Sequence, residues 1–173
     1  MRYILAIYAS ILILIGYPGI ANAESASLPG GISRDDRSII NLWLKEHPRY
    51  RIASDVDCKC EKYLSRARRD RNLGGADYHP YYVKGDLNGD RVSDQAIGVI
   101  EKLKDNEEYR VLIIDGRNHH RAYLSNLFLL GEVMYFGFPR KKPYHLLIGS
   151  QNTEGAVLIP LRNGKYKIQL PEG

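Results

Sequence analysis

The sequence predicts an α+β fold in which two N-terminal helices pack on an antiparallel β-sheet meander of about seven or eight strands. Three observations lead to this fold class. Helical spacing of apolar residues is confined to the region before Asp77. Short β-rich runs follow to the C-terminus, without the strand–helix alternation that a parallel sheet requires. Apolar residues are 44% and charged residues 26% of the 173 residues, which is typical of a globular protein and excludes disorder, collagen and coiled coil.

Residues 1–23 have the three zones of a secretory signal peptide. Arg2 supplies the basic start, an apolar stretch follows, and small residues precede a cleavage site near Ala23. A retained membrane anchor is the alternative, but the apolar run is short for a bilayer span. We therefore expect a periplasmic or secreted protein with no membrane span in its mature chain. That chain is expected to comprise a flexible tail at residues 24–32 and a single α+β domain at residues 33–173.

Two stretches have the spacing of amphipathic helices. Ser33 and Asp36 have capping-box spacing at the start of the first stretch, which Pro48 ends. The apolar stripe of this helix consists of Ile39, Ile40, Trp43 and Leu44. The second helix is expected to begin near Ser54 and to end before Gly74. Its apolar stripe consists of Val56, Cys60, Tyr63, Leu64 and Ala67.

Cys58 and Cys60 stand two residues apart in a chain that is expected to reach an oxidising compartment. On the predicted second helix they point about 200° apart, so that Cys58 faces solvent and the two sulfurs cannot bond. In a turn or an extended segment both could face one way and close a tight ring. The sequence leaves this pairing open. It predicts no zinc site, because none of the five histidines has the spacing that would complete a tetrahedral set.

Eight β-rich runs follow Asp77, and Gly, Asn, Asp or Pro residues separate most of them. The runs are residues 81–84, 95–101, 109–115, 122–129, 133–138, 145–149, 156–162 and 165–170. Asn163 and Gly164, between the last two runs, predict a two-residue hairpin turn because both residue types tolerate positive φ. The two helices are expected to cover one face of the resulting sheet.

The loop at residues 86–94 has oxygen-bearing side chains at its positions 1, 3, 5 and 9. These residues are Asp86, Asn88, Asp90 and Asp94. Calcium takes about six to eight oxygen ligands, so this spacing is typical of a loop wrapped around one ion, with the carbonyl of Val92 as a backbone ligand. An EF-hand is excluded, because Ile97 replaces the bidentate Glu and a strand follows. The alternative is an Asx-rich connection that folds by its own side-chain-to-backbone hydrogen bonds.

A family resemblance rests on the same loop and the strands around it. The sequence YYVKGDLNGD at residues 81–90, followed by DQAIGV at residues 94–99, resembles the strand–loop–strand unit of FG-GAP/VCBS-type proteins. In that family the loop binds calcium, and the unit is usually repeated around a propeller. The resemblance implies that Asp86, Asn88, Asp90 and Asp94 are side-chain calcium ligands.

This sequence departs from the family pattern in two respects. It holds one copy of the unit, so it is similar to small exported bacterial proteins and not to a propeller. Arg91 also stands where the family has Gly, and a positive φ there costs a non-Gly residue about 1 kcal/mol. We therefore expect any calcium site in this loop to be weak.

Two basic clusters predict a surface for an anionic partner, which is an envelope polymer, phospholipid head groups or an acidic envelope or secreted protein. The clusters are Arg66, Arg68 and Arg69, and Arg140, Lys141 and Lys142. Alternatively, the first cluster stabilises the C-terminus of a helix and the second is a solvated turn. Nucleic acid is not an expected partner of an exported chain whose formal net charge is only +5.

The sequence favours an exported, non-enzymatic binding protein, such as an envelope accessory protein or an inhibitor or immunity protein. The alternatives are a purely structural calcium-binding module and a hydrolase that uses the loop carboxylates. The hydrolase is the weaker of the two, because no paired carboxylates outside the loop suggest glycoside hydrolysis. His119 and His120 likewise have no neighbours that would supply the remaining catalytic roles.

Overall fold

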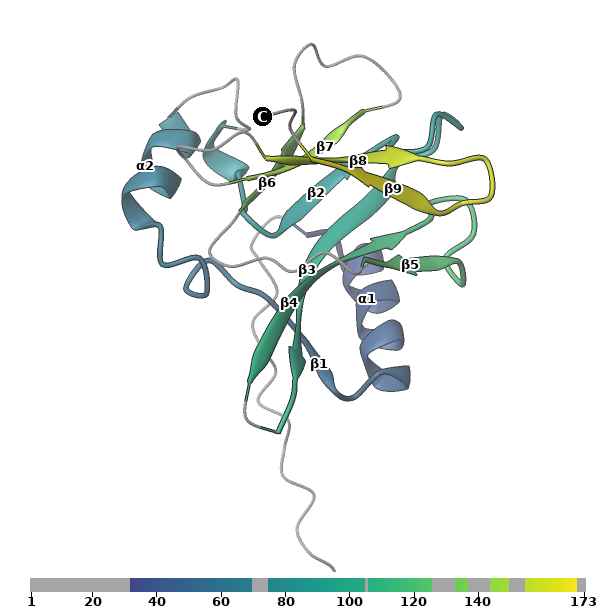
Figure 1. Ribbon diagram of the computed structural model, residues 1–173, viewed down its shortest axis with the longest axis horizontal. Helices are drawn as coiled ribbons and strands as arrows, with labels where there is room; N and C mark the ends of the chain where they lie inside the picture. The colour runs from purple at the N-terminus through teal and green to yellow at the C-terminus, as the bar shows by residue number, and fades with distance from the viewer. Residues whose placement is uncertain are drawn as a thin grey trace, which may run out of the picture.

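The computed structural model describes residues 32–69, 75–104, 106–125, 133–136, 144–149 and 155–170 (Figure 1). Its helical elements are α1 (Arg34–Glu46), α2 (Glu61–Arg69) and the 3-10 turn η1 (Gly75–Asp77). Its strands are β1 (Tyr50–Ile52), β2 (Tyr82–Gly85), β3 (Asp94–Lys102), β4 (Glu107–Ile114), β5 (Ala122–Leu124), β6 (Val133–Phe136), β7 (Leu146–Gly149), β8 (Ala156–Pro160) and β9 (Tyr166–Gln169). No helix within these residues is long and apolar enough to cross a lipid bilayer.

The strands form two sheets, and every ladder in them is antiparallel. In the first sheet, β3 pairs with β4 along its whole length, and β5 follows on the far side of β4. The other edge of β3 pairs with β2 near Ile97 and with β1 near Glu101, so two short strands share that edge. The second sheet has the order β6-β7-β8-β9. The Met134 N–H donates to the Pro80 carbonyl at 2.7 Å, which ties β6 to the segment before β2.

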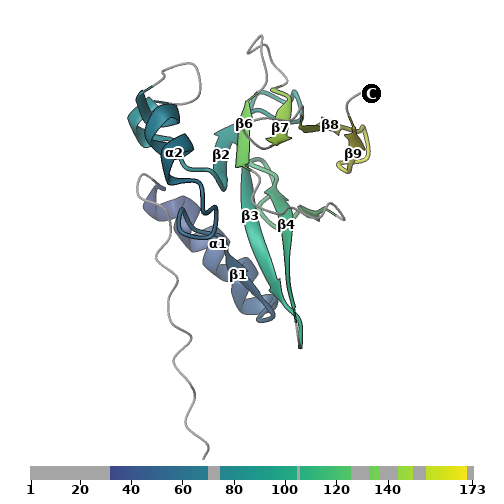
Figure 2. The same cartoon turned by 60° about the vertical axis from the view of Figure 1, so that its left-hand side comes forward.

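The predicted fold class is wrong in its topology. The strands do not form one meander, because β6 to β9 make a separate sheet. The helices are not a consecutive N-terminal pair either, because β1 lies between them. The physical reason lies in β3 and in the second half of β4. Both are buried on both faces and therefore need a layer on each side. Helix α1 covers one face of the first sheet, and the second sheet covers the other (Figure 2).

Alternate residues of β3 and β4 belong to different cores, as the two-residue period of a strand requires. Ile97 and Val99 of β3 pack in a cluster with Ile40 of α1. Ala96 and Ile100, which point to the opposite face, pack in a cluster with side chains of the second sheet. These side chains are Met134, Leu146, Ile148 and Leu158.

Helix α1 begins where the capping residues predict. The Asp36 N–H donates to the Ser33 hydroxyl oxygen at 3.1 Å, and the helix ends at Glu46, before Pro48. The buried Asp36 carboxylate accepts from Lys84 Nζ at 2.7 Å and from Gln95 Nε2 at 2.9 Å. These two contacts fix the helix on the first sheet, since a buried carboxylate needs such donors.

Helix α2 begins at Glu61, seven residues later than Ser54, where the apolar spacing predicts it. The preceding residues form turns because the Asp57 carboxylate accepts from the N–H of Ser54 at 2.7 Å and from Arg51 Nη2 at 2.9 Å. Val56 is consequently 84% exposed and does not belong to an apolar stripe. Cys58 is buried at 3% exposure, contrary to its predicted solvent-facing position, and is disulfide-bonded to Cys60.

The connection between β8 and β9 is a hairpin at the predicted place, but its geometry differs from the prediction. The Leu161 N–H donates to the Lys165 carbonyl at 2.8 Å, and the Gly164 N–H donates to the Leu161 carbonyl at 3.0 Å. Three residues therefore form the loop, and Gly164 supplies the positive φ of 74° at its end.

Candidate functional site

The loop at residues 86–94, called the acidic loop below, connects β2 to β3. The Asp86 carboxylate is 3% exposed and accepts from the N–H of Gly89 at 2.7 Å and of Arg91 at 3.1 Å. Asp94 is 0% exposed and accepts from the N–H of Leu87 at 2.9 Å. These bonds close the acidic loop from both ends, because each buried carboxylate binds backbone donors of the turn between them.

The Asp94 carboxylate also reaches the neighbouring β4–β5 connection. Its other oxygen accepts from the N–H of Gly116 at 2.9 Å. Burial raises the pKa of Asp94, and the nearby Asp115 and Asp90 carboxylates act in the same direction, whereas the two N–H donors lower it. Asp94 thus connects the acidic loop to the β4–β5 connection, although burial disfavours its charged form.

The two middle oxygen side chains of the acidic loop shape its turn. The Asn88 side-chain oxygen accepts from the Asp90 N–H at 2.9 Å, and the Asp90 carboxylate accepts from the Val92 N–H at 2.8 Å. Arg91 has a φ of 70°, so it adopts the left-handed conformation that favours glycine. The acidic loop therefore carries backbone strain at its sixth position.

The predicted calcium ligands lie close together, yet protein donors engage their oxygens. The second Asp90 oxygen pairs with Arg117 Nε at 3.2 Å. The positive charge of Arg117 thereby offsets the repulsion among the carboxylates of the acidic loop. No group of three or more His, Cys, Asp or Glu residues in the described part of the chain is placed to hold a metal ion. Weak calcium binding by Asp86, Asn88, Asp90, Val92 and Asp94 stays a prediction.

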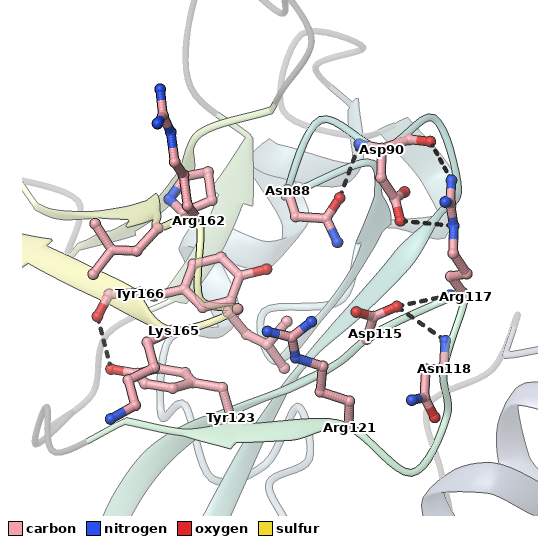
Figure 3. Close-up of a pocket in the computed structure, with 14 residues that line it drawn as sticks. Asn88, Asp90, Asp115, Arg117, Asn118, Arg121, Tyr123, Arg162, Lys165 and Tyr166 are labelled. Carbon is pink, nitrogen blue, oxygen red and sulfur yellow. Dashed lines mark hydrogen bonds and ion pairs between the residues drawn. The ribbon is translucent and has the colours of Figure 1, made fainter.

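A cleft of about 460 Å³ opens beside the acidic loop, between the first sheet and the β8–β9 hairpin (Figure 3). Three segments far apart in the sequence line it: the acidic loop, the end of β4 with its connection to β5, and the hairpin. The lining residues are Asn88, Asp90, Ile113, Asp115, Arg117, Asn118, Arg121, Tyr123, Pro160, Leu161, Arg162, Gly164, Lys165 and Tyr166. We call this space the cleft.

Cations outnumber carboxylates in the cleft. Arg117 is engaged by Asp90, to whose carbonyl it also donates at 2.9 Å. The other three cations form no ion pair with a carboxylate of the described residues. They are Arg121, Arg162 and Lys165, and all three are exposed. Arg121 extends into the middle of the cleft, whereas Arg162 and Lys165 extend outward from its rim (Figure 3).

Gly164 leaves space for the Arg121 side chain. The Arg121 guanidinium donates to the Asn163 carbonyl, so it lies directly on the hairpin turn. A Cβ on Gly164 would lie only 1.7 Å from Arg121 Nη2, and its φ of 74° also disfavours a side chain. The turn therefore needs Gly164 both for its backbone conformation and for the approach of Arg121.

Two tyrosines connect the sheets across the cleft. The Tyr123 hydroxyl of β5 donates to the Tyr166 carbonyl of β9 at 3.2 Å, and the two rings lie 5.2 Å apart. The Tyr166 hydroxyl points from the hairpin toward the acidic loop and has no hydrogen-bond partner among the described residues (Figure 3). Burial raises its pKa, and the nearby Asp94, Asp115 and Asp90 carboxylates raise it further, so this hydroxyl stays a neutral donor.

Arg66, Arg68 and Arg69, which the sequence singles out, lie on α2 and do not line the cleft. Arg68 on α2 donates to the Tyr78 carbonyl at 3.1 Å and pairs with Asp55, so it supports the fold. Arg66 and Arg69 are exposed on the same helix. Residues 140–142 lie outside the described residues. The sequence offers one indirect signal for the cleft, which is that Arg121, Arg162 and Lys165 all flank turns.

In comparisons with known proteins, no family model, no curated protein and no solved structure matches this chain. Function is therefore inferred from the geometry and the charge of the cleft.

Proposed function

We propose that this chain is an exported binding protein, without catalytic activity, that holds an acidic partner in the cleft between β5 and β9. One observation supports this above all: Arg121 lies in the cleft, Arg162 and Lys165 lie at its rim, and none of the three has a carboxylate partner among the described residues. Exposed cations need no partner in the protein, because water solvates them. A cluster of such cations nevertheless attracts a partner of opposite charge.

The composition of the cleft suits a protein partner. Tyrosine and arginine are enriched in protein interfaces, and Tyr123 and Tyr166 present rings beside the cations. The Tyr166 hydroxyl adds a hydrogen-bond donor with no partner among the described residues. An acidic partner would thus find charge, apolar surface and a neutral donor in one place.

The proposal gives the acidic loop a supporting role. Asp86 and Asp94 are buried and engaged by backbone N–H groups, so they hold one wall of the cleft in position. Asp90 in turn fixes Arg117. The basic surface on α2 is the competing partner site, and its exposed cations provide a matched control.

The test compares three forms of the purified protein, each immobilised and exposed to an envelope extract. The cleft variant combines Arg121→Gln, Arg162→Gln and Lys165→Gln, and the control variant combines Lys62→Gln, Arg66→Gln and Arg69→Gln on α2. Both remove three exposed cations. We expect an acidic protein to bind the wild type and the control, and its affinity for the cleft variant to fall at least about tenfold.

Salt and a stability control complete the experiment. Binding should weaken as ionic strength rises, because the attraction between exposed charges is screened. Unfolding of all three forms in urea should give matching midpoints, which would show that the cleft variant is folded. The proposal fails if the cleft variant retains the same proteins as the wild type, or if only the α2 variant loses its partner.

A further inference from the structure

We infer that the acidic partner binds as an extended strand that adds to the outer edge of β9. This inference rests on the proposed function and specifies the conformation in which the partner binds. Within the described residues, β9 is the last strand of the second sheet and pairs with β8 alone. An edge strand of this kind offers its backbone to an incoming chain.

The register of the hairpin shows which backbone groups point outward. The Leu161 N–H donates to the Lys165 carbonyl, so Lys165 is in a hydrogen-bonded position, and the next pair, Pro160 with Tyr166, is not. By alternation, Tyr166 and Ile168 direct their N–H and C=O groups away from β8. The Tyr166 carbonyl confirms this direction, because it accepts from the Tyr123 hydroxyl of the opposite sheet.

Three of the outward backbone groups have no partner in the described part of the chain. They are the N–H of Tyr166 and the N–H and C=O of Ile168. A strand laid along this edge would satisfy them. It would also lie beside the cleft, because Tyr166 is one of the residues that line it.

The two faces of β9 define the sequence pattern of that strand. Tyr166 and Ile168 are half-buried and pack against the core between the sheets. Lys165 and Lys167 alternate with them, are exposed, and have no carboxylate partner among the described residues. Cross-strand neighbours share a face, so a complementary strand alternates apolar residues with carboxylates.

A second copy of this chain is a poor occupant of the same edge. Two copies paired through β9 would bring their exposed lysines onto one sheet face, and like charges opposite each other destabilise a strand pair. Lysine on an edge strand also discourages self-association generally. The charge of the edge therefore favours an acidic segment of another protein.

The probe for this inference is a fluorescent, end-blocked peptide that alternates valine with aspartate. Two versions carry backbone N-methyl groups, on the valines in one and on the aspartates in the other. In an antiparallel addition, the residues opposite Tyr166 and Ile168 share their inward face. They accept from both N–H groups, and the residue opposite Ile168 also donates to its carbonyl. We expect methylated valines to lower the affinity at least tenfold and methylated aspartates to change it less than threefold, as measured by fluorescence anisotropy.

A charge variant gives the second arm. Lys165→Gln with Lys167→Gln should lower the affinity for the unmethylated peptide severalfold, while the control, Lys102→Gln with Lys104→Gln at the far end of β3, should not. All four lysines are exposed, so each variant removes two surface charges.

The outcomes separate this inference from the proposed function. If both methylated peptides bind as tightly as the parent peptide while the lysine variant weakens binding, the cleft still binds acidic ligands but strand addition is wrong. If no peptide binds and the Lys165 and Lys167 variant aggregates instead, the lysines only protect the edge and the inference is overturned. The envelope-extract experiment then decides the proposed function independently.

Discussion

The acidic loop and the β8–β9 hairpin face the same cleft from opposite sides, but they use their charged residues differently. In the loop, Asp86 and Asp94 are 3% and 0% exposed, and backbone N–H groups donate to both. On the hairpin, Arg162 and Lys165 are exposed and form no ion pair within the described residues. A buried carboxylate must be satisfied inside the fold, whereas an exposed cation is satisfied by water.

This difference separates the residues that build the cleft from those available to a partner. Removing a loop carboxylate should therefore cost stability, and removing a hairpin cation should cost binding. The acidic loop was the obvious candidate for chemistry in the sequence, yet the structure engages its oxygens in hydrogen bonds that hold the turn.

The substitution Asp86→Ala should destabilise the protein by about 3 kcal/mol, since it removes two hydrogen bonds to a charged and buried acceptor. The lost partners are the N–H groups of Gly89 and Arg91. Urea unfolding measures the change. Arg162→Ala on the hairpin is the matched comparison and should change stability by less than about 0.5 kcal/mol. Equal effects of the two substitutions would contradict the division between loop and hairpin.

Local signals in the sequence predicted the parts of the fold that depend on local bonds. Ser33 caps α1, and Gly164 ends the hairpin loop with positive φ. The start of α2 was mispredicted because apolar spacing does not reveal the Asp57 network that holds residues 54–60 in turns. Arg51, one of the donors to Asp57, is a strand residue that also pairs with Glu107 of β4, so the first sheet anchors this network.

The sequence contains a signal for the packing of one sheet on the other, but the single-sheet prediction did not use it. Residues 94–101 are buried on both faces, and in the sequence they read as an almost continuous apolar run between Asp94 and Glu101. Such a run is typical of a strand with a layer on each side. A meander with helices on one face leaves the other face of this strand exposed, which is why the single-sheet prediction fails.

The cleft could not be predicted from the sequence. Its lining comes from three segments that approach one another only when the second sheet folds over the first. The basic clusters that the sequence does display are contiguous, and one of their members, Arg68, is committed to Asp55 and to the Tyr78 carbonyl. Because Arg121 is far from Arg162 and Lys165 in the sequence, the sequence does not indicate that the three cations lie at one cleft.

The substitution Gly164→Ala is expected to affect both stability and partner binding. It should cost about 1 kcal/mol of stability, because the φ of 74° is strained for a residue with a Cβ, and it should displace Arg121 from the hairpin. Gly89→Ala in the acidic loop is the control, because its φ of 84° has the same sign but the residue does not line the cleft. Both variants should lose similar stability in urea unfolding, while only Gly164→Ala should lose partner binding. Unchanged binding by Gly164→Ala would show that Arg121 does not contact the partner.

The smallest expected effect is that of calcium. Because protein donors and Arg117 already engage the loop oxygens, millimolar calcium should stabilise the wild type over a chelator by no more than about 1 kcal/mol. Arg91→Gly removes both the strained φ of 70° and a cation beside the loop, so its difference between calcium and chelator should be larger. Arg91→Lys keeps the charge and the Cβ, and it should respond like the wild type. The difference in Tm between the two solutions is the quantity to compare, because Gly also changes the stability of the metal-free loop. If Arg91→Gly melts at the same temperature with calcium and with chelator, hydrogen bonds alone account for the acidic loop, and its resemblance to a calcium loop is limited to its turn.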